Sequence, residues 1–148
     1  MYNYLGNKEL LKKWKIGFLA SRKISTSSVL PILDWAVSIS KQTDVVIVSG
    51  FHSRLEKEVL RFLLHGKCGI IVVLARGMYR KLPKQYEEAM NENRLLIIST
   101  EKDNIKRISE MTAYKRNKYI VEICDEQKFI GIDKYSSLYK IIKRYVQK

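Results

Sequence analysis

The sequence contains little cysteine and proline, and it has no apolar run of membrane-spanning length. Only 2 of its 148 residues are cysteines, and Cys68 and Cys124 lie in apolar or helical surroundings without CxxC spacing. We therefore expect two reduced thiols, with neither a disulfide nor a bound metal. A spanning helix needs roughly 18 apolar residues, and residues 1–15 lack the apolar core of a signal peptide. These absences predict a cytoplasmic protein that does not contact a membrane.

Familiar nucleotide-binding and catalytic motifs are absent as well. The chain has no G-x-G-x-x-G segment and no G-x-x-x-x-G-K-[ST] segment, which disfavours ordinary dinucleotide binding and a P-loop. Neither His52 nor His65 has the spacing of a metal ligand. Glu56 and Glu101 are the acids expected near the strand ends, and hydrolysis by paired carboxylates needs more than this. We expect no catalytic residue and no cofactor.

Acidic residues are scarce relative to basic ones. Lysine and arginine together number 28 against 15 aspartates and glutamates, which gives a formal net charge of +13. Such an excess raises the local concentration of polyanions around the surface. Nucleic acid is the commonest partner that exploits it, because phosphate contacts release condensed counterions. The alternative is a charge that serves only general solubility.

Short apolar runs alternate with helical patterns along the chain. The runs predict buried strands at 16–20, 44–50, 69–75, 94–100 and 128–133. The helical patterns cover 27–42, 53–66, 83–93, 103–126 and 136–148. This alternation predicts an α/β fold, a Rossmann-like three-layer sandwich with a mainly parallel sheet of about five strands.

Residues 15–148 are expected to form this single domain. Residues 1–14 are expected to be a loosely attached N-terminal extension, which Tyr2, Tyr4 and Trp14 can anchor. The basic tail at 136–148 predicts a final helix that packs one face on the sheet, and a separate binding element is the alternative.

Local signals predict where the helices begin and end. Ser28 is expected to cap the first helix, and Ser53 with Glu56 forms a capping box for the second. Gly66 is expected at the left-handed position after that helix. The helix at 103–126 is expected to be broken near residues 111–113.

Polar and cationic residues follow several of the predicted strands. Parallel strands end at one edge of the sheet, where ligands bind in open α/β folds. Hydroxyls and backbone N–H groups bind phosphate oxygens, and arginine adds bidentate contacts. The candidate phosphate-binding residues are Ser21, Arg22, Lys23, Ser49, Gly50, His52, Arg54, Arg76 and Gly77. Phe51 and Tyr79 are expected to stack on bases, although ordinary polar turns are the alternative for each loop taken alone.

The segment YKRNKY, residues 114–119, adds a second basic element. It places Lys115, Arg116, Asn117 and Lys118 between two tyrosines, within about one helical turn. Cations for the backbone and aromatic rings for bases suit single-stranded nucleic acid. The alternative is a solvated helix face flanked by core tyrosines.

Five segments in sequence order resemble the DNA-processing protein A (DprA, or Smf) family. They are IGFLASRKIS, VVIVSGF, IIVVLARGMYRKLP, LLIIST and KRNKYI, and the resemblance spans about residues 15–132. It implies a Rossmann-like core that binds single-stranded DNA, acts in DNA recombination or uptake, loads RecA recombinase and forms a homodimer.

The motif residues that the resemblance carries over are a subset of those candidates. They are Ser21, Arg22, Ser49, Gly50, Gly77, Arg116 and Asn117. Lys118 replaces the second arginine of the family's R-N-R motif and lacks its bidentate fork. Ala20 replaces a glycine in the first loop, while Arg54 and Glu56 stand in for the A-R-G-x-D segment.

Three functions compete at this point. The leading one is a non-catalytic protein that binds single-stranded nucleic acid across the strand ends. The second is a nucleotide-binding or nucleotide-processing protein that resembles the phosphoribohydrolases, whose P-G-G-x-G-T-x-x-E motif is absent. The third is a protein-interaction module that retains only the fold.

Overall fold

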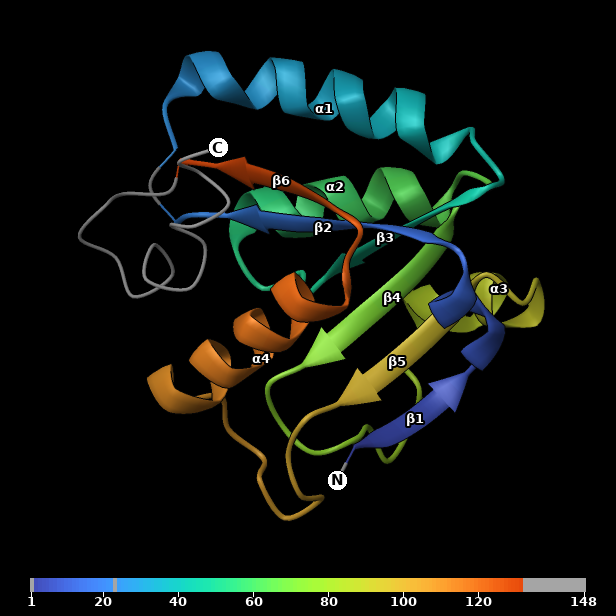
Figure 1. Cartoon of the computed structure of the whole chain (residues 1–148), viewed down its shortest axis with the longest axis vertical. Helices are drawn as coiled ribbons and strands as arrows, with labels where there is room; N and C mark the ends of the chain where they lie inside the picture. Colours follow the sequence, from blue (N-terminus) through green and yellow to red (C-terminus); the bar gives the residue numbers. More distant parts are fainter. Residues whose placement is uncertain (1, 23, 132–148) are drawn as a thin grey trace.

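A six-stranded sheet forms the centre of the molecule in the computed structural model, which describes residues 2–22 and 24–131. The strand order is β1-β5-β4-β3-β2-β6. The strands are β1 (Asn3–Gly6), β2 (Trp14–Ala20), β3 (Val45–Ser49), β4 (Gly69–Leu74), β5 (Leu95–Ser99) and β6 (Glu126–Ile130). Every neighbouring pair in this sheet is parallel except β1 with β5 (Figure 1).

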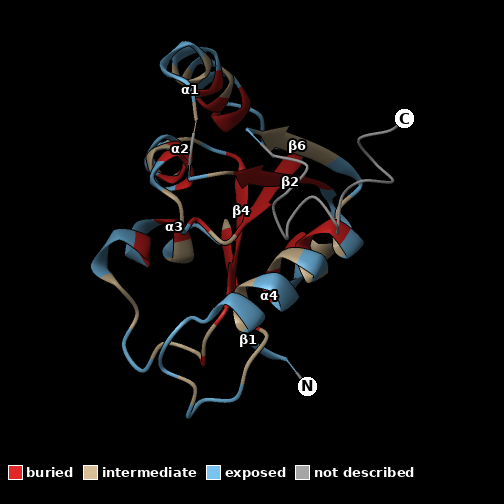
Figure 2. Ribbon diagram, turned by 90° about the vertical axis from the view of Figure 1, so that its left-hand side faces the viewer, coloured by how far each residue is buried: buried red, intermediate tan, exposed pale blue. Residues whose placement is uncertain are grey.

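Helices cover both faces of the sheet, which makes three layers (Figure 2). The helices are α1 (Thr26–Ser40), α2 (Arg54–Leu64), α3 (Glu87–Asn91) and α4 (Glu110–Ile123), with short 3₁₀ helices η1 (Lys8–Lys12) and η2 (Lys84–Tyr86). One core lies between the sheet and α1, α2 and α3, and the other lies under α4 and η1. The α/β class and the mostly parallel sheet are confirmed.

The central strands β3 and β4 are almost wholly apolar because both of their faces are covered. In β3, Val45 and Ile47 face the core under α1 and α2, while Val46 and Val48 face the core under α4. The adjacent strand β4 alternates in the same way. This two-sided burial explains why the residues VVIV of β3 and IIVVL of β4 form continuous apolar runs.

The N-terminal residues contribute a strand that the sequence did not predict. β1 pairs antiparallel with β5, with Tyr4 opposite Ile98. Asn7 continues the connection, because its backbone N–H donates to Leu95 O at 3.0 Å and its side-chain amide donates to Asn93 O at 2.8 Å. The segment expected to be a loosely attached extension therefore contains an edge strand of the sheet.

The helix boundaries agree with the sequence at α2 and differ at α1 and α4. The Ser53–Glu56 capping box is confirmed. The expected cap at Ser28 is wrong, because α1 begins at Thr26 after Ser25. The expected helix over 103–126 is too long, since the reciprocal hydrogen bonds of Ser109 and Thr112 start α4 at Glu110.

Two further expectations, about a break in α4 and about the residue that ends α2, are wrong. α4 is continuous through residues 111–113. Gly66 does not have positive φ. Glycine is needed at this position because a Cβ there would lie 2.4 Å from Ser40 O.

Some expectations fall outside the part of the chain that the structure describes. They concern Lys23, the end of the last predicted strand and the helix at 136–148. Within the described residues, no helix is long and apolar enough to cross a membrane. Cys68 and Cys124 are free thiols, and Cys68 is buried.

Candidate functional site

Three arginines follow three neighbouring parallel strands at the same edge of the sheet. Arg22 follows β2, Arg54 begins α2 after β3, and Arg76 follows β4. Parallel strands end at a common edge, so their following loops lie side by side (Figure 1). Arg22 and Arg54 are exposed and Arg76 is half-buried. We call these three residues the strand-end rim.

A cationic groove lies where the loops after β4 and β5 separate. The loop after β4 leads to α3 on one face of the sheet, and the loop after β5 leads to α4 on the other (Figure 2). The cavity between them has a volume of about 980 Å³. Its lining residues are Arg76, Met78, Tyr79, Arg80, Lys81, Asp103, Asn104 and Lys106. Among these residues four cations face one carboxylate, and we call the cavity the β4–β5 groove.

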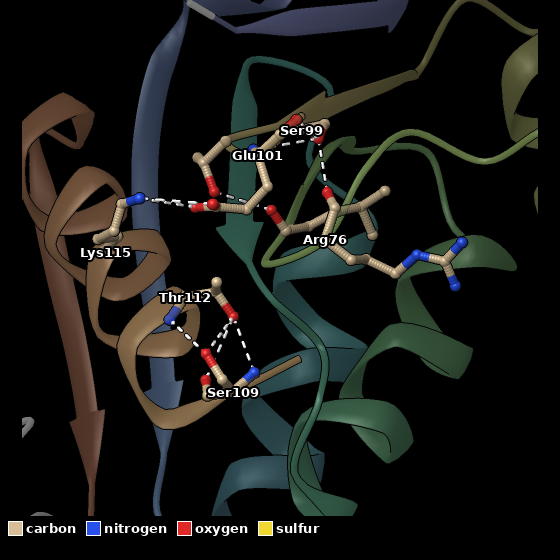
Figure 3. Close-up of polar contacts among 8 residues, drawn as sticks. Arg76, Ser99, Glu101, Ser109, Thr112 and Lys115 are labelled. Carbon is tan, nitrogen blue, oxygen red and sulfur yellow. Dashed lines mark hydrogen bonds and ion pairs between the residues drawn. The ribbon is translucent and has the colours of Figure 1, made fainter. Parts of the chain in front are cut away.

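Contacts between the two loops fix the shape of this groove. The Ser99 hydroxyl lies 2.5 Å from Arg76 O and 3.0 Å from Glu101 O (Figure 3). Gly77 N–H donates to Ile105 O at 2.7 Å. A Cβ on Gly77 would lie 2.6 Å from Asp103 Cα, so only glycine permits this close packing. Gly77 therefore acts on the shape of the groove through its backbone.

An aromatic ring forms part of the groove wall. The Arg76 guanidinium carbon lies 5.4 Å from the centroid of the Tyr79 ring, which is favourable for a cation–π contact. Tyr79 is half-buried and its ring lies 6.3 Å from that of Tyr86. Burial raises the pKa of Tyr79, so its hydroxyl is neutral at physiological pH. Tyr79 combines a ring with an adjacent cation at one point of the wall.

Glu56 is buried where the loops after β2 and β3 meet. Its carboxylate accepts hydrogen bonds from the backbone N–H groups of Ala20 at 2.9 Å, His52 at 2.9 Å and Ser53 at 3.1 Å. Three converging N–H groups form a favourable site for an anion. The chain's own carboxylate occupies that site.

Arg116 lies beneath the same loops and is only 4% exposed. Its guanidinium packs against Gly50, where an added Cβ would come within 2.1 Å of Nη1. Its Nε donates to Asn117 Oδ1 at 2.7 Å. Burial lowers the pKa of Arg116, and the negative charge of Glu56 opposes that change. Arg116 thus contributes its charge from below the surface.

Ser49 at the end of β3 and Phe51 in the following loop are likewise internal. Ser49 is fully buried and its hydroxyl accepts a hydrogen bond from Phe51 N at 3.1 Å. Phe51 is 5% exposed and packs in the core, so the expected stacking of its ring on bases is wrong. Its φ of 48° is unusual for a bulky residue and turns the chain sharply toward α2. The Phe51 ring, which we expected to contact a ligand, anchors the loop in the core instead.

His52 is exposed and lies among charges from several elements. Partial burial lowers its pKa, and so do the positive charges of Arg116, Lys57 and Arg22, while Glu56 raises it. These groups come from α4, α2 and the loop after β2. His52 therefore lies where the charges of those three elements converge.

The cations of YKRNKY point to different places. Arg116 lies inside, whereas Lys115 reaches Glu101, with Nζ 3.3 Å from Oε2 (Figure 3). Lys118 is exposed, and with Lys115 it lines a second, smaller pocket beside α4. Neither lysine is among the lining residues of the β4–β5 groove. The structure thus separates residues that the sequence grouped.

Three cations of the groove are not among the candidate phosphate-binding residues predicted from the sequence. Arg80 and Lys81 follow the third predicted strand, and Lys106 was placed inside a helix that begins only at Glu110. The signal available was the density of basic residues in 76–81 and 102–107. Recognising that these two segments face each other requires the sheet order.

The fold and this edge define a class of protein: a Rossmann-like α/β domain with a cationic groove at the carboxyl ends of its strands. The sequence matches the family described as DNA recombination-mediator protein A over residues 1–134. The chain belongs to this family.

Solved structures of two DNA processing proteins A (DprA) have the same fold. The protein from Streptococcus pneumoniae gives a TM-score of 0.76 at 20% identity, over 99% of this chain and 51% of that one. The protein from Helicobacter pylori is described for its single-stranded DNA binding mode. It gives a TM-score of 0.74 at 18% identity, over 98% of this chain and 68% of that one. The chain thus spans about half the length of the S. pneumoniae protein. No curated protein sequence matches the chain significantly.

Proposed function

We propose that this chain is a non-catalytic, single-stranded DNA-binding protein that acts in DNA recombination or uptake. The observation that carries the proposal is that Arg76 belongs both to the strand-end rim and to the lining of the β4–β5 groove, where three further cations join it. Arginine and lysine there can contact successive phosphates, and Tyr79 supplies a ring for a base. Membership of the DNA recombination-mediator family supports a role on DNA.

The state of the carboxylates supports a binding role rather than catalysis. Glu56 accepts three backbone hydrogen bonds, and Glu101 is paired with Lys115. Asp103 accepts a hydrogen bond from the Asn3 amide at 2.9 Å. Among the described residues at this edge, each of these three acids has a structural partner, which is a poor arrangement for general acid–base work.

The proposal extends to the partners that the family resemblance implies. A homodimer and a recombinase of the RecA type are proposed partners, and the cytoplasm is the proposed compartment. Residues 15–148 are proposed as the DNA-binding domain, with residues 1–14 as an N-terminal extension that adds β1 to its sheet.

Fluorescence titration with labelled oligonucleotides tests the binding proposal. We expect preference for single-stranded DNA over duplex and over mononucleotides. The logarithm of affinity should fall with the logarithm of salt concentration with a slope of about −0.7 per phosphate contacted. Arg76→Ala should weaken binding to all sequences, because phosphate contacts carry no sequence information.

A matched control distinguishes a local site from the overall charge. Arg61→Ala removes the same charge from the far end of α2, where Arg61 pairs with Glu58 at 3.3 Å. We expect this variant to bind as the unmodified protein does. Equal losses from both variants would contradict a site at the rim, and tight binding of mononucleotides alone would favour the nucleotide-binding alternative.

A further inference from the structure

A second pocket lies on the α4 side of the loop that follows β5. Its volume is about 240 Å³, and its lining residues are Tyr2, Thr100, Lys115, Lys118, Tyr119 and Glu122. It brings together the N-terminus, the end of β5 and the middle of α4. We call it the tyrosine pocket.

The two tyrosines form an aromatic platform in this pocket. The rings of Tyr2 and Tyr119 have centroids 4.7 Å apart and planes inclined by 46°. Tyr119 is half-buried and hydrogen-bonded to the side chain of Tyr4, and burial raises its pKa. Tyr2 is 42% exposed. A fixed inner ring and an accessible outer ring provide a surface on which a flat, uncharged group can stack.

Lys118 beside the platform can bind an anionic ligand that carries such a flat group. Lys115 and Lys118 are exposed at the pocket, against the one carboxylate of Glu122 among its lining residues. Lys115 is held by Glu101, whose side chain is 9% exposed. Lys118 has no ion-pair partner among the described residues, so its ammonium group can bind a phosphate. A nucleotide combines the base and the phosphate that these features suit.

Only a short turn separates the tyrosine pocket from the β4–β5 groove. Thr100 lines the first and Asp103 lines the second, and three residues of chain span at most about 11 Å. The amide of Asn3, next to Tyr2, donates to Asp103. Figure 3 shows Glu101 lying between Lys115 on one side and Arg76 on the other, with the Arg76 side chain extending away from Glu101. The two cavities therefore adjoin across residues 100–103.

We propose that a single strand bound in the β4–β5 groove continues over residues 100–103 into the tyrosine pocket, where a base stacks on Tyr2 and Tyr119 and Lys118 contacts a phosphate. This inference rests on the proposed function and extends it to a second contact site on the α4 side of the loop after β5. Stacking needs an unpaired base, because a duplex hides its base faces, so the site selects single strands.

Binding as a function of oligonucleotide length tests this path. The probes are labelled oligothymidylates of increasing length, and the variants are Tyr2→Ala, Tyr2→Phe and Lys118→Ala in the full chain. Short probes that fill only the groove should bind all variants equally. Longer probes should bind Tyr2→Ala at least about five-fold more weakly, as expected for one lost stacking contact, and Tyr2→Phe should retain the affinity. Lys118→Ala should reduce the salt slope by about 0.7 for long probes alone.

Matched controls and a second readout keep the test specific. Tyr114→Ala removes an exposed tyrosine of α4 that is not among the residues lining the pocket, and it should bind all probes normally. Photocrosslinking with 5-iodouracil near one end of a long probe should label Tyr2 or Tyr119 by mass spectrometry. Crosslinks confined to Tyr79 would overturn the inference.

The failure of this inference can be separated from the failure of the proposed function. If Tyr2→Ala matches the unmodified protein at every length while Arg76→Ala weakens all probes, the path into the tyrosine pocket is wrong and the groove proposal stands. If no single-stranded probe binds, both proposals are wrong.

Discussion

His52 is one of two histidines in the chain, and it is exposed among cations. Because its pKa is lowered in the folded protein, its neutral form contributes stability above the unfolded pKa of about 6.5. That contribution is lost as pH falls through the lower, folded value. A bound phosphate near His52 would have the opposite effect on its pKa, because an anion favours the protonated ring.

Because a bound phosphate would raise the pKa of His52, the affinity for DNA should depend on pH. We expect single-stranded DNA to bind more tightly as pH falls from about 8 to below about 6.5, with uptake of a proton at His52. His52→Gln should flatten this dependence, whereas His65→Gln should leave it intact, because the His65 ring bonds Arg61 O at the far end of α2. Histidine titrations by NMR with and without oligonucleotide measure both effects. An unchanged His52 pKa on binding would place the phosphates elsewhere.

At the residue scale, the sequence grouped positions that the fold brings together, but it did not predict how deeply they are buried. Ser49, Gly50 and Arg116 were identified together, and the structure brings Gly50 and Arg116 into contact. The burial of Ser49 and Arg116 was not predictable, because it depends on how α4 packs across β3 from more than sixty positions away in the chain. A sequence motif gives residue identity, whereas depth below the surface depends on the tertiary fold.

At the level of elements, the capping box of α2 has a role beyond the helix. Ser53 satisfies one N–H of α2, whereas Glu56 also joins the loop after β2 to the loop after β3. The Glu56 carboxylate of the capping box therefore fixes the distance between the loop after β2 and the loop after β3.

We expect Glu56→Ala to cost more stability than Ser53→Ala. Ser53→Ala should lower the free energy of unfolding by about 1 kcal/mol, the usual cost of a lost cap. Glu56→Ala leaves several buried or partly buried donors unpaired and should cost about 2–5 kcal/mol. Urea denaturation measures both, with Glu58→Ala on the same helix as a control expected within about 0.5 kcal/mol of the unmodified protein. Equal costs for Ser53→Ala and Glu56→Ala would contradict the joining role.

Helix boundaries were predictable only where the start signal was unique. Ser53 with Glu56 is a single strong signal, and α2 begins where it predicts. Residues 25–28 offer four hydroxyls in a row, so the choice of Ser28 over Ser25 was not resolved by local chemistry. Residues 103–108 have a composition compatible with a helix, but the chain there forms the wall of the β4–β5 groove.

For the whole molecule, the alternation of apolar runs and helical patterns was sufficient to predict the α/β class. It did not predict β1, because this strand has four exposed residues and no apolar periodicity. It did not predict the groove either, since that cavity depends on strand order, which places the loops after β4 and β5 beside each other.

β1 covers one edge of a very apolar strand, β5, whose five residues are all buried. Unpaired apolar edges promote association between chains. Removal of residues 1–6 should therefore increase aggregation and lower the free energy of unfolding by about 1–3 kcal/mol, from several lost ladder hydrogen bonds. Light scattering and urea denaturation measure these effects, and Tyr2→Ala, which leaves β1 in place, is the control. A truncated chain that stays monodisperse and equally stable would contradict this role.

The buried carboxylate of Glu56 has a consequence for selectivity. A small anion entering between the loops after β2 and β3 would meet a like charge where other proteins offer open backbone donors. Under the proposed function, ligand contacts at this edge are made by long side chains such as those of Arg22 and Arg54, which are exposed. A lone nucleotide gains little from such dispersed contacts, whereas a polymer can engage many of them at once.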